Sequence, residues 1–138
     1  MSDRDFLDTD VLVYAYDVTS QRKQQVAQDL LRRALLGEMM TSSQVLAEFA
    51  ATLLHKPTRA VGSGVLSAAL DALAPIPLVL VDGDVVRTAV DVRAKYGLHF
   101  YDGMIVAAAR RGGCARLLSE DFNAGQRYLG VLVENPFV

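Results

Sequence analysis

Four acidic residues stand beside apolar segments of this chain, in positions where a carboxylate is costly unless something positive meets it. Asp8 follows Phe6 and Leu7 directly, and Asp102 follows Phe100 and Tyr101 in the same way. Glu48 and Asp121 come shortly after further apolar pairs. Because carboxylates gathered in one place repel each other, a cluster of these acids predicts a site for divalent metal ions. The candidate catalytic and metal-binding residues are Asp8, Glu48, Asp102 and Asp121.

The elements that must position these acids alternate along the chain between apolar strand segments and amphipathic helical segments. We expect strands at about residues 6–7, 38–41, 77–81, 116–118 and 131–133, and helices at 11–16, 21–36, 41–55, 65–74, 85–96, 103–111 and 122–128. Asp10 and Thr41 are predicted N-caps, and residues 77–81 are predicted to be a strand covered on both faces. This alternation predicts a three-layer α/β/α domain with a mainly parallel central sheet. At 138 residues, the chain is expected to form one domain, residues 1–138.

The expected sheet explains how distant acids meet. In an open parallel sheet, ligands bind beyond the carboxyl ends of the strands. Asp8 and Asp121 come just past such ends, Asp102 ends a short extended approach at residues 99–101, and Glu48 joins from its helix.

Two like charges about 4 Å apart repel by about 4 kcal/mol at an effective dielectric near 20. Oxygen ligands without His or Cys favour Mg²⁺ or Mn²⁺ over zinc, and such ions activate water against a phosphodiester.

Each acid taken alone also fits an ordinary structural role. Asp102 is suited to cap a helix, Asp8 and Asp121 to stand in turns, and Glu48 to face solvent. Only their convergence favours a metal site over these readings.

Composition narrows the setting in which such a site works. The formal net charge of −2 argues against general attraction to nucleic acid but leaves room for a local basic surface. The candidate phosphate contacts are Arg22, Lys23, Lys56, Arg59, Arg110 and Arg111, although a solvated helix end or loop is the favoured explanation for each pair. The single cysteine, the polar first five residues and the lack of a long apolar stretch predict a cytoplasmic protein without a membrane span.

Several segments together resemble the PIN domain, the ribonuclease fold of VapC-type bacterial toxins. The similar segments, which follow the family's order and spacing, are residues 6–15, 43–49, 101–109, 117–122 and 135–137. The resemblance implies that Asp8, Glu48 and Asp102 are metal-site acids and that Asp121 completes the set. It also implies a metal-dependent endoribonuclease that uses Mg²⁺ or Mn²⁺, forms a homodimer, and is the toxin of a toxin–antitoxin pair neutralised by a small antitoxin.

The chain departs from that family at two positions. Asp10 stands where Asn or Ser is common, and is either an additional ligand or an acid that supports the ligands. Ser119 stands where Thr is common and keeps the hydroxyl, which with Thr9 is a candidate for orienting the acids.

Two alternatives remain open from the sequence. The first is a haloacid dehalogenase-type phosphatase, with Asp8 as nucleophile and Asp10 as general acid, although no lysine follows Lys95 where that family needs one. The second is a catalytically inactive PIN-like binding module. A phosphorylated Asp8 would support the first, and the absence of stabilisation by Mn²⁺ would support the second.

Overall fold

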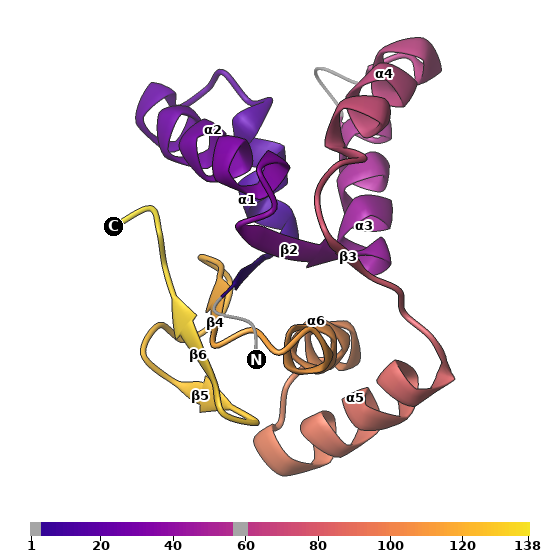
Figure 1. The fold of residues 1–138 in the computed structure, drawn as a ribbon, viewed down its shortest axis with the longest axis vertical. Helices are drawn as coiled ribbons and strands as arrows, with labels where there is room; N and C mark the ends of the chain where they lie inside the picture. The colour runs from indigo at the N-terminus through magenta and orange to yellow at the C-terminus, as the bar shows by residue number, and fades with distance from the viewer. Residues whose placement is uncertain (1–3, 57–60) are drawn as a thin grey trace.

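The computed structural model describes residues 4–56 and 61–138, so the first three residues and Arg59 lie outside the described part. Figure 1 shows the helices and strands along the chain. The strands are β1 (Asp5–Leu7), β2 (Met39–Ser42), β3 (Leu78–Val79), β4 (Arg116–Leu118), β5 (Arg127–Tyr128) and β6 (Val131–Glu134). The helices are α1 (Thr9–Ala15), α2 (Gln21–Leu35), α3 (Ser43–Leu54), α4 (Ser63–Leu73), α5 (Gly83–Tyr96) and α6 (Phe100–Arg111).

The strands form one sheet in the order β3-β2-β1-β4-β6-β5. All neighbouring pairs are parallel except β5 and β6, which form an antiparallel hairpin. The central strand β1 pairs Phe6 with Met40 of β2 on one side and with Leu117 of β4 on the other. As a result, the carboxyl ends of β1 and β4 lie next to each other at one edge of the sheet.

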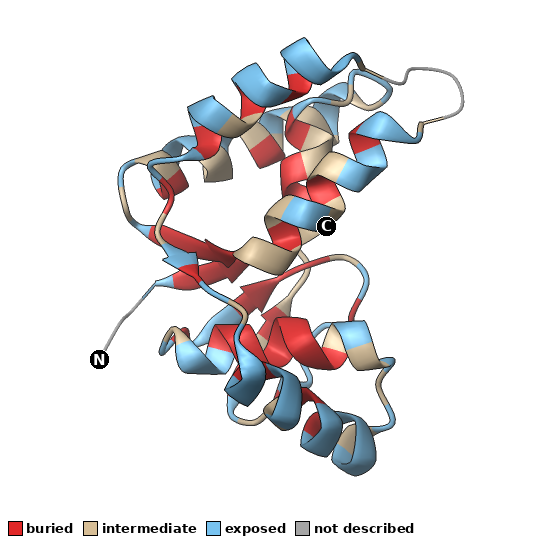
Figure 2. Cartoon of the chain, turned by 90° about the vertical axis from the view of Figure 1, so that its right-hand side faces the viewer, coloured by how far each residue is buried: buried red, intermediate tan, exposed pale blue. Residues whose placement is uncertain are grey.

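Helices cover the sheet on both sides, which confirms the predicted fold class. Helices α1, α2 and α3 lie above the strands in Figure 1, with α4 packed on α3, and α6 and α5 lie below. Buried residues line the strands and the inward sides of the helices, as Figure 2 shows. Phe6, Leu7 and Leu117 are completely buried at the centre of this core. Within the described residues, no helix combines the length and apolar character needed to cross a membrane.

Two predicted helix caps are wrong because a residue one or two positions away takes the role. Helix α1 begins earlier than expected, at Thr9, and its N-cap is Asp8, whose Oδ1 accepts a hydrogen bond from the Thr9 backbone N–H at 2.7 Å. Asp10 therefore lies inside the first turn. Helix α3 is capped by Ser42, while the Thr41 hydroxyl instead donates to the backbone carbonyl of Leu7 and ties β2 to β1.

Three expected elements also differ. The segment 77–81 contributes only Leu78 and Val79 as an edge strand, and Leu78 and Leu80 are exposed, so it is not covered on both faces. The segment 99–101 is not extended, because His99 caps α6 and the helix starts at Phe100. The expected helix at 122–128 is a turn leading into β5, and the β5–β6 hairpin places Leu129 at a positive φ of 51°.

Candidate metal centre

Three aspartates meet at the carboxyl ends of β1 and β4. Asp8 follows β1 directly, Asp10 lies in the first turn of α1, and Asp121 lies in the loop after β4. Each offers a carboxylate oxygen, and these oxygens all lie within 4.8 Å of one another. The backbone N–H of Asp8 donates to the carbonyl of Leu118 at 3.1 Å, which extends the pairing of the two strands up to the cluster. The parallel sheet thus brings together acids that are more than a hundred residues apart.

The loop after β4 is built to hold this cluster. The completely buried hydroxyl of Ser119 donates to Asp8 Oδ2 at 2.8 Å and lies 3.3 Å from Asp10 Oδ2. The same oxygen accepts from the backbone N–H of Asp121 at 3.0 Å. The backbone N–H of Glu120, between Ser119 and Asp121, donates to Asp10 Oδ2 at 2.7 Å. One serine and two backbone amides therefore fix the relative positions of all three aspartates.

Glu48 reaches the same region from α3. Its Oε1 accepts from the Thr9 hydroxyl at 2.8 Å, and its Oε2 accepts from the Gln44 side-chain amide at 2.9 Å. The Gln44 amide also donates to the backbone carbonyl of Tyr101 at 2.9 Å, which links α3 to the start of α6. Glu48 is thus oriented by two donors and lies beside the three-aspartate group without belonging to it.

Asp102 lies in the first turn of α6, half-buried at the side of the site near Glu48. Burial is the main cause that raises the pKa of its carboxyl, the charge of His99 opposes the rise, and the charges of Glu48 and Asp121 add to it. The structure therefore gathers the four acids expected from the sequence in one region, but only Asp8 and Asp121 belong to the tight group. Its third member, Asp10, was predicted as a helix cap from the local pattern, and as an additional ligand or a supporting acid from the resemblance.

The electrostatics of the group fit a cation. Burial raises the pKa of Asp8 to about 6, although hydrogen bonds from Ser119 and Thr9 oppose the rise. Burial and the neighbouring Asp8 charge raise the pKa of Asp10 to about 7. The buried Asp10 Oδ1 also has no hydrogen-bond partner among the described residues. Carboxylate oxygens that are held together, hard to ionise and incompletely paired match the ligand set of a hard divalent ion.

A hollow of about 580 Å³ opens beside the aspartates. Among the described residues that line it there are several acids and no Lys or Arg. These acids are Asp10, Asp17, Glu48, Glu120 and Asp121. Such a surface repels a phosphate unless cations are bound to it.

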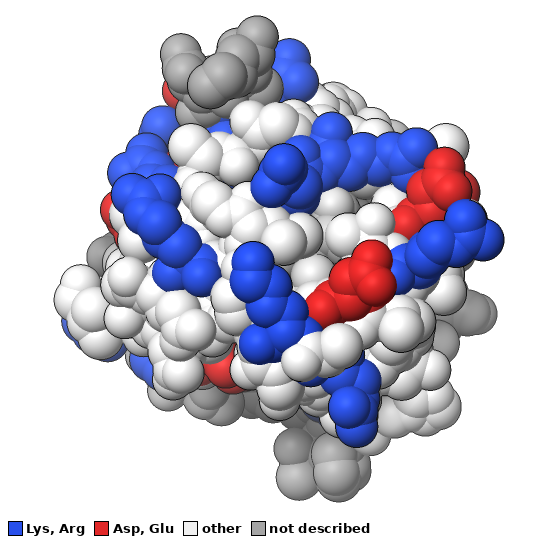
Figure 3. Space-filling view, turned by 90° about the horizontal axis from the view of Figure 1, so that it is seen from below, with Lys and Arg blue, Asp and Glu red and all other residues white. Residues whose placement is uncertain are grey.

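Of the basic residues considered for phosphate contact, the five that the structure describes are all engaged within the chain. Arg22 donates to the Phe137 carbonyl and Arg110 to the Leu129 carbonyl, both at 2.6 Å. Arg111 pairs with Asp82 at 2.5 Å. Lys23 and Lys56 pair with Glu120 and Asp17, two acids that line the hollow. Elsewhere, Figure 3 shows Lys and Arg gathered on the face where α5 lies, which carries the exposed Arg87, Arg93 and Lys95.

Comparison with known proteins places this geometry in a family. A family model described as PIN domain matches residues 6–127. No curated protein sequence matches the chain.

Solved structures are similar in fold at low sequence identity. A DNA-bound VapBC from Salmonella typhimurium aligns with a TM-score of 0.69 and 16% identity over 99% of both chains. A toxin–antitoxin complex from Klebsiella pneumoniae aligns with a TM-score of 0.68 and 18% identity, covering 95% of this chain and 96% of the other. A VapC toxin from Mycobacterium tuberculosis that cleaves the sarcin-ricin loop aligns with a TM-score of 0.67 and 20% identity, covering 85% and 89%.

Proposed function

Because the chain belongs to the PIN domain family, we propose that it is a metal-dependent endoribonuclease that hydrolyses RNA phosphodiester bonds with Mg²⁺ or Mn²⁺. The observation that carries this proposal is the group formed by Asp8, Asp10 and Asp121, with the buried Asp10 Oδ1 left without a partner. Such a group is costly in a metal-free protein and becomes favourable when a divalent ion binds.

Each acid has a role in this proposal. Asp8, Asp10 and Asp121 would hold one ion, and Glu48 and Asp102 would hold a second ion or its bound water. A bound ion of this kind lowers the pKa of water and neutralises charge on a phosphate. Ser119 and Thr9 keep the ligand oxygens aimed by donating to Asp8 and Glu48. Asp121 is the exposed member of the three, so it is placed to accept a proton from an attacking water.

The structure disfavours the phosphatase alternative. A nucleophilic aspartate needs an oxygen free to attack phosphorus. Asp8 is 5% exposed, and both of its oxygens accept hydrogen bonds, from the Thr9 amide and the Ser119 hydroxyl. Acid-quenched protein is therefore expected to carry no phosphate on Asp8 after incubation with phosphomonoesters.

We further propose that the protein is the toxin of a toxin–antitoxin pair, acts as a homodimer and is neutralised by a small antitoxin. The proposal rests on the structural likeness to toxin–antitoxin complexes along almost the whole chain. An apolar groove of about 540 Å³, lined by Leu53, Val65 and Leu66 among others, offers a surface on which a partner chain can bury apolar side chains.

The central test is RNA cleavage with Mn²⁺ and with a chelator. Wild type is expected to cut RNA only with the metal, and Asp8→Asn to lose cutting while remaining folded. Asp29→Asn is the matched control, because Asp29 is an exposed acid on α2 that pairs only with Arg32 among the described residues. Cutting that survives a chelator or the Asp8 substitution would contradict the proposal. Failure of Mn²⁺ to raise the melting temperature would instead favour the inactive binding module.

A further inference from the structure

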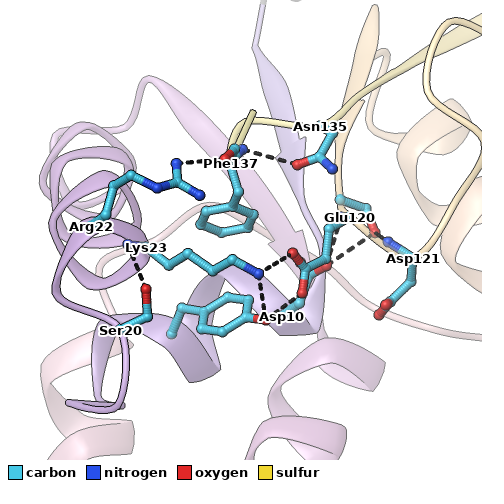
Figure 4. A network of polar contacts seen from close by, with 10 residues as sticks. Asp10, Ser20, Arg22, Lys23, Glu120, Asp121, Asn135 and Phe137 are labelled. Atoms are coloured by element: carbon cyan, nitrogen blue, oxygen red, sulfur yellow. Dashed lines mark hydrogen bonds and ion pairs between the residues drawn. The ribbon is translucent and has the colours of Figure 1, made fainter.

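A lysine from α2 is anchored at the edge of the acidic hollow by two groups that line it. Figure 4 shows the Lys23 side chain reaching from α2 toward Glu120 in the loop after β4. Lys23 Nζ donates to Glu120 Oε2 at 2.9 Å and to the Tyr14 hydroxyl at 3.2 Å. Tyr14 and Glu120 both line the hollow, and the Glu120 backbone N–H is the donor that holds Asp10. Lys23 is therefore one residue removed from the metal-binding group.

The position of the ammonium group is fixed from several sides. Lys23 Nζ lies over the Tyr14 ring, 4.8 Å from its centroid, and 5.8 Å from the centroid of the Phe137 ring. Tyr14 and Phe137 pack edge to face with centroids 4.9 Å apart. The C-terminal segment is itself held, because Arg22 donates to the Phe137 carbonyl and Asn135 Oδ1 accepts from the Phe137 amide, as Figure 4 shows. The ammonium therefore loses little conformational freedom when it binds a further group.

The ion pair with Glu120 leaves part of Lys23 available. An ammonium carries three N–H donors, and two of them go to Glu120 and Tyr14 among the described residues. The Tyr14 hydroxyl also donates to Glu120 Oε1, so the carboxylate shares its charge between two donors. The Lys23 side chain is 28% exposed, so part of it remains open to solvent.

An RNA strand needs a cation at this place. The lining of the hollow is acidic, so metal ions attract the phosphate that reacts, but the next phosphates along the strand meet carboxylates. Lys56 also pairs with an acid of the lining, Asp17, at a longer distance of 3.5 Å. Lys23 is the lysine joined to the aspartate group itself, through Glu120 and Asp10.

We propose that Lys23, held in place by Tyr14 and Glu120, binds a non-bridging oxygen of an RNA backbone phosphate next to the one that is cleaved. This inference rests on the proposed ribonuclease function. It makes Lys23 a substrate-binding residue whose position is set by the Tyr14–Glu120–Phe137 packing.

The test compares four proteins on an oligoribonucleotide that wild type cuts with Mn²⁺: wild type, Lys23→Gln, Lys23→Arg and Arg33→Gln. Arg33 is the matched control because it is a cation on the same helix that pairs with Glu38 at its far end. Each protein is also assayed on a series of substrates with one neutral methylphosphonate at successive positions. Melting temperatures are recorded for all four.

Lys23→Gln is expected to raise KM about tenfold, the loss that follows when one hydrogen bond to a charged group is removed, with little change in kcat. Lys23→Arg should restore most of the affinity, and Arg33→Gln should behave as wild type. At one position near the cut, the methylphosphonate should raise the KM of wild type by about the same factor as Lys23→Gln raises it on the natural substrate. The same methylphosphonate should not raise the KM of Lys23→Gln any further.

Two results would overturn the assignment of Lys23. One is that the losses from Lys23→Gln and from the methylphosphonates add at every position. The other is that the variant lowers kcat and the melting temperature while KM is unchanged, which would make Lys23 only a support for the loop. If wild type cuts no RNA with Mn²⁺, the proposed function itself fails, so the two failures are distinguishable.

Discussion

The buried aspartates make a quantitative prediction about stability without metal. The pKa of Asp10 rises from 3.8 to about 7, and that of Asp8 rises from 3.8 to about 6, in both cases mainly through burial. A carboxyl whose pKa is higher in the folded state favours folding while it is protonated. Its contribution to the free energy of unfolding is fully present below about pH 4 and is lost as the pH rises through the folded-state pKa. The metal-free protein should therefore become less stable between about pH 4 and pH 7.

Replacing Asp10 with Asn removes its share of this cost. A pKa difference of one unit corresponds to about 1.36 kcal/mol, so a rise of about three units costs up to about 4 kcal/mol at pH 8. Asn keeps an oxygen that can accept from the Glu120 backbone N–H. The free energy of unfolding of Asp10→Asn is thus expected to exceed that of wild type by about 2–4 kcal/mol at pH 8 in chelator. At pH 4.5 the two values should differ by no more than about 1 kcal/mol.

Urea unfolding with a chelator and with Mn²⁺ checks this reasoning. At a metal concentration of about 100 times its dissociation constant, the free energy of unfolding of wild type should rise by about 2.7 kcal/mol. That of Asp10→Asn should rise by less. The control Asp29→Asn should match wild type under all conditions, since Asp29 is exposed on α2. If Asp10→Asn is less stable than wild type in chelator at pH 8, the pKa of Asp10 is not raised and the electrostatic argument for a metal site fails.

Substitutions at three further positions test the supports of the site and the packing of the fold. Ser119→Ala removes a buried donor and should weaken Mn²⁺ binding about 10–100-fold in a thermal titration, while Ser119→Thr should retain it. Thr9→Val removes a donor to Glu48 and should reduce the rate of RNA cleavage without changing the urea midpoint. Gly103→Ala places a Cβ 3.0 Å from the backbone oxygen of Ala89, at the contact of α6 with α5. This substitution should lower the unfolding free energy by about 1–3 kcal/mol. An unchanged urea midpoint would show that the two helices can move apart by the few tenths of an ångström that the Cβ needs.

The meeting of Asp8 and Asp121 could be predicted from the sequence because it depends on two robust features. Each acid follows a short apolar segment, and alternating strands and helices produce a parallel sheet. Strand β1 pairs in parallel with β4, so the acids that follow them meet whatever the length of chain in between. Patterns of apolar residues carry that information directly.

Asp102 reaches the site for a different reason from the one expected. The sequence suggested that Asp102 ends a short extended approach at residues 99–101 and that the helix begins after it. In the structure, His99 caps α6 through its imidazole, which accepts from the Tyr101 backbone N–H at 3.3 Å. Histidine is an uncommon cap, so propensity alone gave no reason to start the helix there.

The segment 122–128 shows how tertiary contacts override local pattern. The segment was expected to be a short helix, but the buried rings of Phe122 and Tyr128 lie together in the core with centroids 5.9 Å apart. The chain between them turns, and β5 pairs with β6 as a hairpin. The conformation of the segment is fixed by the pairing of β5 with β6, and β6 lies outside the residues 122–128 from which the helix was predicted.

Asp10 marks the limit of prediction from local signals, because its role depends on where α1 begins. If the helix began two residues later, Asp10 would be the N-cap. Its carboxylate would then accept a hydrogen bond from a backbone N–H of the first turn. Since Asp8 takes the cap with Oδ1 and receives Ser119 on Oδ2, Asp10 falls in the first turn and faces the loop after β4. The residues that hold Asp8 and Asp10 in these positions include Ser119 and Glu120, more than a hundred residues away along the chain. The sequence therefore left Asp10 open between a helix cap, an additional ligand and a supporting acid, and the structure places it in the three-aspartate group.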